Sequence, residues 1–154
     1  MEISVTLASL DMKQQLHALM QPYLTELSQY DEVDADYPYF DAYWRDDDRW
    51  PYLIKADDQI AGFALVNKWS PSQLGTDFAI AEFYILPAFR KNGIGSSTFL
   101  LLLEKHKGIW EVSIIGDNHT AHNFWKTTIH QANILHLKQI LEEPEVIYRF
   151  TTKG

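Results

Sequence analysis

The order of apolar and polar residues at the start of the chain predicts a strand followed by a helix. Apolar side chains at every second position predict a strand over residues 3–7. Over residues 16–27 they recur every three or four positions, which predicts a helix with Ser9 or Asp11 as its N-cap. We expect Pro22 to kink or split this helix, because proline has no N–H to donate to the backbone ladder.

The pattern in the middle of the chain predicts three strands. Residues 52–56 and 60–66 have the composition of strands, and the two Asp residues at 57–58 between them favour a hairpin turn. Ser, Pro and Gly residues predict a loop over 68–76. An apolar run then predicts a further strand over 77–86.

After this strand the pattern becomes glycine turn, helix and strand. Gly93 and Gly95 precede a helical run over 96–107 that Gly108 ends, and a strand over 110–115 follows. The spacing suits a crossover connection in which the strands before and after the helix lie parallel.

A second helix and two strands complete the chain. Asn118 is the expected N-cap of this helix, and residues 135–140 and 146–151 predict the closing strands. A length of 154 residues suits one domain that buries about 70% of its unfolded surface. We therefore expect a single α/β domain spanning residues 1–154. The apolar face of the second helix consists of Ala121, Phe124, Trp125 and Ile129.

The composition excludes several classes of protein. With 13 basic and 21 acidic residues the net charge is −8, so we expect no nucleic acid partner. The absence of Cys excludes disulfides, thiolate zinc sites and a cysteine nucleophile. The longest apolar run, Phe99–Leu103, is far shorter than the roughly 20 residues of a membrane-spanning helix, and the N-terminus lacks the order of a signal peptide. We expect a cytoplasmic protein with no membrane partner.

Most of the negative charge lies in residues 30–52, which we call the acidic aromatic segment. It contains eight acids and two bases, a local balance of −6, and eight of the 21 aromatic residues. A disordered acidic linker is poor in aromatics, so we expect this segment to fold onto the rest of the domain. The acids are Asp31, Glu32, Asp34, Asp36, Asp41, Asp46, Asp47 and Asp48, and the aromatics are Tyr30, Tyr37, Tyr39, Phe40, Tyr43, Trp44, Trp50 and Tyr52.

The run from Phe83 to Ser96 carries the clearest chemical signal. In this run a strand and a proline are followed by Gly93 and Gly95, where a helix begins. Successive backbone N–H groups and the positive end of the helix dipole can then bind a single anion. Glycine allows the anion to approach the backbone, and Arg90 and Lys91 add charge at the rim. The pattern favours pyrophosphate binding. The open alternative is an ordinary tight turn between strand and helix.

Two other phosphate-binding motifs are absent. A nucleotide P-loop requires Gly-x-x-x-x-Gly-Lys-Ser/Thr, and no such string occurs. A dinucleotide fingerprint requires a third glycine at position 98, which is Thr98.

The motif Arg90-x-x-Gly93-x-Gly95 occurs together with two further signals. A strand ending in Phe-Tyr-Ile-x-Pro precedes it, and Asn118-x-x-Ala121-x-x-Phe124-Trp125 follows it. The combination, over residues 77–129, resembles the GNAT superfamily of acyl-coenzyme A dependent N-acetyltransferases. The resemblance implies a mixed, mostly antiparallel sheet that is splayed between its fourth and fifth strands, with the pantetheine arm in the gap.

The resemblance also implies acetyl-coenzyme A as co-substrate and residues that hold it, with no metal. The backbone of Tyr84, Ile85 and Leu86 would pair with pantetheine, and amides of Arg90, Lys91, Asn92, Gly93, Ile94, Gly95 and Ser96 would hold the pyrophosphate. Asn118, Phe124 and Trp125 would line the far side.

The implied reaction is direct attack of a neutral amine on the acetyl thioester. A backbone N–H of Tyr84 or Ile85 would stabilise the oxyanion, and Glu82 is the candidate base. In a regular strand Glu82 shares a face with Phe78, Ile80 and Tyr84, where desolvation raises its affinity for protons. The open alternative is a carboxylate on a solvated strand face.

The sequence departs from the family pattern at Trp125. Many relatives have Tyr in this aromatic pair, where its hydroxyl can protonate the leaving thiolate, and an indole cannot do so. The role of acid could pass to Tyr84, to Tyr148 or to water, or have no dedicated residue. The alternative function is a non-catalytic or regulatory module that binds coenzyme A.

By the same resemblance, the acidic aromatic segment covers the acceptor site. Carboxylates and aromatic faces attract cations, so Tyr39, Tyr43, Trp44 and Asp46 are the candidate residues for binding a cationic small-molecule or peptide amine. The competing interpretation is a solvated acidic face over aromatics that complete the core. Relatives often pair, so the chain is also a candidate homodimer.

Overall fold

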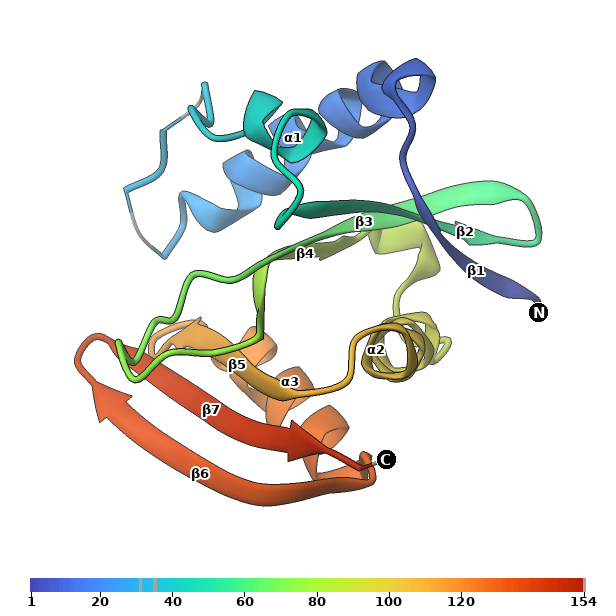
Figure 1. Cartoon of the computed structure of the whole chain (residues 1–154). Coiled ribbons are helices and arrows are strands. Elements are labelled where there is room, and N and C mark those ends of the chain that lie inside the picture. The colour runs from blue at the N-terminus through green and yellow to red at the C-terminus, as the bar shows by residue number, and fades with distance from the viewer. Residues whose placement is uncertain (31, 35, 154) are drawn as a thin grey trace.

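The protein is built around one seven-stranded sheet with the order β1-β2-β3-β4-β5-β7-β6 (Figure 1). The computed structural model describes residues 1–153 except 31 and 35, so Asp31 of the acidic aromatic segment is outside the described residues. All neighbouring strands are antiparallel except β4 and β5, which are parallel. The strands are β1 (Ile3–Leu7), β2 (Trp50–Ala56), β3 (Gln59–Asn67), β4 (Phe78–Ile85), β5 (Ile109–Ile115), β6 (Ile134–Glu142) and β7 (Glu145–Thr152).

Helices cover both faces of the sheet and create two apolar cores. One core lies between α1, the acidic aromatic segment and the sheet, and we call it the α1 core. The other lies between α2, α3 and the opposite face, and we call it the α2–α3 core (Figure 1). The helices are α1 (Lys13–Leu27), α2 (Ile94–Lys105) and α3 (His119–Gln131), with short 3₁₀ turns η1 (Leu10–Met12), η2 (Asp41–Trp44) and η3 (Pro87–Phe89).

The predicted strands and helices are present, with small shifts at their ends. Asp57 and Asp58 have φ values of 50° and 69°, as a tight hairpin turn between β2 and β3 requires. The expected α/β class, with a mostly antiparallel sheet, is confirmed. In the described part of the chain, no helix is long and apolar enough to cross a membrane.

The expectations about the first helix are met only in part. Helix α1 is not split at Pro22, because this residue lies on the exposed side of a helix whose neighbouring Tyr23 and Leu24 are anchored in the α1 core, and a kink there stays a prediction. Its N-cap is Met12, and neither Ser9 nor Asp11 supplies a capping side chain. Packing against the sheet therefore outweighs the missing backbone hydrogen bond at the proline.

The loop between β3 and β4 is held by a buried ion pair. Glu111 on β5 is 0% exposed and accepts hydrogen bonds from Arg149, from the Ser70 hydroxyl at 3.1 Å and from the Ser72 amide and hydroxyl at 3.0 and 2.6 Å. Burial alone would raise the pKa of Glu111, but the hydrogen bonds from Ser72, Arg149 and Ser70 outweigh it and lower the pKa. The loop is therefore tied to the sheet by a carboxylate that stays ionised.

We predict that Arg149→Met lowers the free energy of unfolding by about 3–5 kcal/mol, because Glu111 becomes an uncompensated buried charge. Urea unfolding followed by tryptophan fluorescence measures this loss. Arg45→Met removes only an exposed ion pair with Asp46 and serves as the control, with an expected change below about 1 kcal/mol. Equal stability of the two variants would contradict the prediction.

Candidate functional site

Strands β4 and β5 separate soon after they begin. They pair only at Phe78 with Trp110, Ala79 with Glu111 and Ile80 with Val112. Beyond Ile80, the β5-facing edge of β4 has no strand partner among the described residues. The expected splay between the fourth and fifth strands is therefore present, and it leaves backbone groups of β4 available to a ligand.

A β-bulge lies at the point where the two strands part. Leu65 of β3 pairs with Glu82, but the next residue, Val66, pairs with Ile80, so Ala81 is an extra residue in β4. The bulge reverses the faces of the side chains that follow it. Phe78 and Ile80 pack in the α2–α3 core, whereas Tyr84 packs in the α1 core.

The bulge corrects one expectation about Glu82. This residue shares the α1 face with Tyr84, as expected, but it does not share a face with Phe78 or Ile80. The expectation assumed that side chains alternate regularly between the two faces of β4. One inserted residue shifts this alternation, so the side chains after it lie on the opposite face.

Two tyrosine hydroxyls from different segments hold the Glu82 carboxylate. The Tyr23 hydroxyl of α1 donates to Oε1 at 2.5 Å, and the Tyr37 hydroxyl of the acidic aromatic segment donates to Oε2 at 3.0 Å. Desolvation by burial raises the pKa of Glu82, and the two hydrogen bonds partly oppose this rise. The carboxylate is thus enclosed, and the alternative of a solvated strand face is wrong.

The phenols themselves stay protonated. Burial, together with the negative charge of Glu82, raises the pKa of Tyr23 and of Tyr37 well above the usual value. Both therefore act as permanent donors to Glu82, which remains able to accept a further proton or hydrogen bond at its other lone pairs.

The backbone of β4 faces alternately toward β3 and toward the gap. The Leu86 N–H donates to Ala61 O at 2.7 Å, and Leu86 O accepts from Phe89 N at 2.9 Å. A Cβ on Gly62 would lie 1.9 Å from Tyr84 O, so this carbonyl also faces β3. By alternation, the backbone groups that face the gap belong to Phe83 and Ile85.

Of the three residues expected to offer their backbone to pantetheine, only Ile85 therefore faces the gap. The Leu86 backbone is engaged within the fold and the Tyr84 carbonyl faces β3, so the pairing of these two residues with pantetheine stays a prediction. Phe83 was missed. Backbone groups of a strand face its two edges in alternation, so Phe83 can be identified once one residue that bonds to β3 is known. The sequence does not show which residues of β4 bond to β3.

The turn between β4 and α2 has the features of an anion site. Gly93 is the N-cap of α2 with φ of 76°, and no side chain caps the helix. The first N–H groups of α2, at Ile94, Gly95 and Ser96, have no intrahelical acceptor, and the helix dipole makes this end positive. Lys91 and Asn92 are exposed beside them. These residues fit a pyrophosphate.

Gly95 has a second role in the packing of α3. A Cβ at this position would lie 2.8 Å from the ring of Phe124, so glycine lets α3 approach the turn closely. Asn118 caps α3 by accepting from the Ala121 N–H at 3.1 Å, as expected.

Arg90 does not contribute a free charge to this turn. Its guanidinium donates to both carboxylate oxygens of Glu26 at 2.8 Å, and its Nε donates to Ile85 O at 2.8 Å. Its backbone N–H donates to Pro87 O at 3.3 Å. The contact of Arg90 with the pyrophosphate stays a prediction. Arg90 connects the end of β4 to α1, a long-range contact that sequence spacing does not reveal.

The aromatic residues beyond the gap differ in exposure. Phe124 is half-buried, whereas Trp125 is buried and packs edge-on against Phe83 and Phe99 at centroid distances of 5.0 and 5.1 Å. The Tyr148 hydroxyl lies 3.2 Å from His122 Nε2 in the same core. Tyr84 lies on the face of Glu82, and desolvation by burial raises its pKa.

Cations of the protein itself contact the residues expected to bind a cationic acceptor. The Arg49 guanidinium lies 5.8 and 5.4 Å from the ring centroids of Tyr39 and Tyr43, and Lys13 lies 5.4 Å from that of Trp44. Asp46 contacts Arg45 and Arg49. These four residues therefore stabilise the acidic aromatic segment internally, and their role in binding an acceptor stays a prediction.

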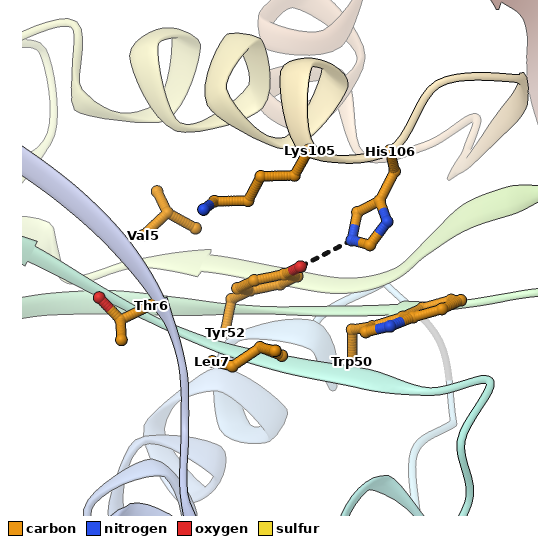
Figure 2. A pocket seen from close by; sticks show the side chains of 7 residues that line it. All are labelled: Val5, Thr6, Leu7, Trp50, Tyr52, Lys105 and His106. Atoms are coloured by element: carbon orange, nitrogen blue, oxygen red, sulfur yellow. Dashed lines mark hydrogen bonds between the residues drawn. The ribbon is translucent and has the colours of Figure 1, made fainter.

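Two hollows lie outside the gap. The larger, of about 380 Å³, is at the C-terminal end of α2, the opposite end from Gly93 (Figure 2). There the Tyr52 hydroxyl and His106 Nε2 are 2.6 Å apart, and Lys105 extends toward Val5 (Figure 2). The smaller, of about 200 Å³, is lined by Asp48, Arg49, Asn67, Lys68 and Trp69. Across the described residues, no three His, Asp or Glu side chains are placed to bind a metal.

Sequence comparison is consistent with this architecture. The sequence model of the Acetyltransferase (GNAT) family matches residues 13–128, which is more than half of the chain. The chain therefore belongs to the GNAT family of acetyltransferases. No curated protein sequence matches it significantly.

Several solved structures share the fold, including two of GNAT-family acetyltransferases. One from Streptococcus agalactiae superposes with a TM-score of 0.73 at 14% identity, covering 99% of this chain and 96% of that chain. One from Staphylococcus aureus Mu50 has a TM-score of 0.71 at 11% identity, covering 99% and 100%. The protein PH1933 from Pyrococcus horikoshii has a TM-score of 0.67 at 24% identity, also covering 99% and 100%.

We predict that Tyr37→Phe raises the pKa of Glu82 further, because a lost donor to the carboxylate favours the protonated form. A ¹³C NMR titration of the Glu82 side-chain carboxyl carbon measures this directly. Tyr39→Phe is the matched control, since Tyr39 lies in the same segment and is 61% exposed. An unchanged Glu82 titration in Tyr37→Phe would show that the hydrogen bond does not act on the carboxylate.

Proposed function

We propose that the protein transfers an acetyl group from acetyl-coenzyme A to a primary amine by direct attack. The observation that carries this proposal is the bulge at Ala81, which turns Glu82 toward two phenols where the β4 edge becomes free. Family membership supports acetyl transfer, and the acceptor class is a small molecule or a peptide.

The residues of the gap and the turn fit the co-substrate. The N–H groups of Lys91, Asn92, Gly93, Ile94, Gly95 and Ser96 hold the pyrophosphate, with the charge of Lys91 beside them. The gap-facing backbone of Phe83 and the Ile85 carbonyl would pair with the pantetheine amides. Asn118, Phe124 and Trp125 form the opposite wall, with Phe124 nearest the turn. When bound, the thioester supplies an acetyl carbonyl that is open to attack.

Glu82 accepts the proton of the attacking amine. An amine is mostly protonated at neutral pH, and a carboxylate whose pKa is raised by burial is a better base than an exposed one. The permanent donors Tyr23 and Tyr37 keep the carboxylate in one orientation during proton transfer. The Ile85 N–H, which faces the gap, stabilises the oxyanion.

Tyr84 is the proposed acid for the leaving thiolate. It lies two residues from Glu82 on the same face, and burial keeps its proton in place. Trp125 cannot supply a proton.

A second candidate function is coenzyme A binding without turnover. The burial of Trp125 between Phe83 and Phe99, in place of a family tyrosine, favours this alternative. Release of free thiol from acetyl-coenzyme A in the presence of a panel of amines separates the two functions.

We predict that Glu82→Gln lowers kcat/KM by about 10²–10⁴-fold, because the amine loses its proton acceptor. Thiol release at saturating acetyl-coenzyme A measures the loss. Glu104→Gln, on the exposed face of α2, is the control and should retain the activity of the natural protein. Full activity of Glu82→Gln would remove Glu82 from the mechanism.

We also predict that Gly93→Asp weakens coenzyme A binding by more than about tenfold. The change places a carboxylate at the proposed pyrophosphate site and strains a residue with φ of 76°. Isothermal titration calorimetry with coenzyme A measures binding. Gly75→Asp is a matched control, because Gly75 also has a positive φ, of 90°, and open space around its Cβ position. If both variants bind equally well, the anion site lies elsewhere.

A further inference from the structure

The smaller hollow lies at the acceptor end of the proposed active site. Asn67, which lines it, pairs with Ala79, two residues before the bulge residue Ala81. By strand alternation from Leu65, the Asn67 side chain lies on the α1 face, as does Glu82. An acceptor with its amine at Glu82 therefore has this hollow within reach along the same face.

The acidic aromatic segment contacts both the hollow and Glu82. Asn67 Nδ2 donates to the Tyr43 hydroxyl of this segment at 3.2 Å. Tyr37 of the same segment donates to Glu82 Oε2 at 3.0 Å. The hollow and the proposed base are thus both bordered by phenols of one segment.

Arg49 forms one wall and is held in a fixed orientation. Its guanidinium lies over the rings of Tyr39 and Tyr43, and its Nε contacts Asp46 Oδ2 at 3.3 Å. The Asp46 contact uses Nε, so the two terminal nitrogens can still bind another acceptor. An arginine ordered in this way loses little entropy when it binds a carboxylate through two parallel hydrogen bonds.

Lys68 and Trp69 also line the hollow. Trp69 is 75% exposed, yet its backbone N–H donates to Asn67 Oδ1 at 3.1 Å. The loop that follows is fastened to the buried Glu111 by Ser70 and Ser72. An exposed indole on an anchored loop offers a fixed apolar surface beside the hollow.

The charges around the hollow favour an anion. Among the residues that line it, Arg49 and Lys68 contribute two positive charges and Asp48 one negative charge, and Asp46 contacts Arg49 from outside the lining. Two cations therefore lie at this hollow in a chain whose net charge is −8.

We propose that this hollow binds the carboxylate of the acceptor, so that the substrate is an amine that also carries a carboxylate, such as an amino acid or a short peptide. The inference rests on the proposed acetyl transfer and specifies its acceptor. Arg49 binds the carboxylate, Lys68 adds charge, and Trp69 packs against the connecting atoms. This acceptor replaces the cationic amine expected from the sequence.

Matched pairs of acceptors test the inference. Alanine, Ala-Phe and Ala-Phe-Phe are compared with their C-terminal amides, so that three spacings between amine and carboxylate are covered. We expect kcat/KM to be at least about tenfold higher for the free acid of one length, as expected for an added bidentate ion pair. Arg49→Gln should bring that acid and its amide to equal kcat/KM.

Arg45→Gln is the control variant. Arg45 also contacts Asp46 but does not line the hollow, so this variant should keep the preference for the free acid. Arg49→Lys keeps the positive charge but cannot form two parallel hydrogen bonds to a carboxylate. This variant should retain part of the preference for the free acid. Equal rates for every acid and amide pair, or a preference that survives Arg49→Gln, would overturn the inference while leaving acetyl transfer intact.

A binding experiment gives a readout that does not depend on turnover. The Trp69 indole N–H signal in ¹⁵N NMR should shift when the favoured free acid is added and not when its amide is added. If no acceptor is acetylated but this shift occurs and is lost in Arg49→Gln, the proposed reaction fails while the carboxylate site stands. Absence of the shift with every free acid would overturn the carboxylate site.

Discussion

The extra residue at Ala81 is the constraint on which the candidate site depends. A regular β4 would place Glu82 on the face of Phe78 and Ile80, inside the apolar α2–α3 core and away from the phenols that hold it. The bulge turns Glu82 and Tyr84 toward α1 instead. Pairing with β5 ends at the same place, so one irregularity sets both the position of the carboxylate and the free edge of β4.

A largely buried carboxylate needs donors, and here they come from parts of the chain far apart in sequence. Tyr23 is on α1 and Tyr37 is in the acidic aromatic segment, so Glu82 holds both elements against the sheet. The ion pair of Arg90 with Glu26 joins the same helix to the end of β4. The acceptor side and the cofactor side of the proposed site thus share α1 as a common support.

The sequence predicted most of the local structure correctly. The strands, the Asn118 cap and the Gly93 turn all follow from patterns of a few adjacent residues, and the structure contains them. Glu82 was also identified from the sequence, although on a wrong description of its face. The sequence did not show the partners of Arg90 and of the aromatic segment, which are Glu26, Lys13 and Arg49. Charge counts do not show which carboxylates and rings are already paired within the fold.

By itself, the sequence determined the order of elements, the glycine turn at the start of α2 and the resemblance that identifies the family. These depend on local backbone preferences and on spacing, which are properties of short segments. Tertiary structure alone decided which face Glu82 occupies, which backbone groups of β4 remain free and where the cations of an acidic chain lie. Each of these depends on strand register or on contacts between distant residues, and a shift of one residue reverses the outcome.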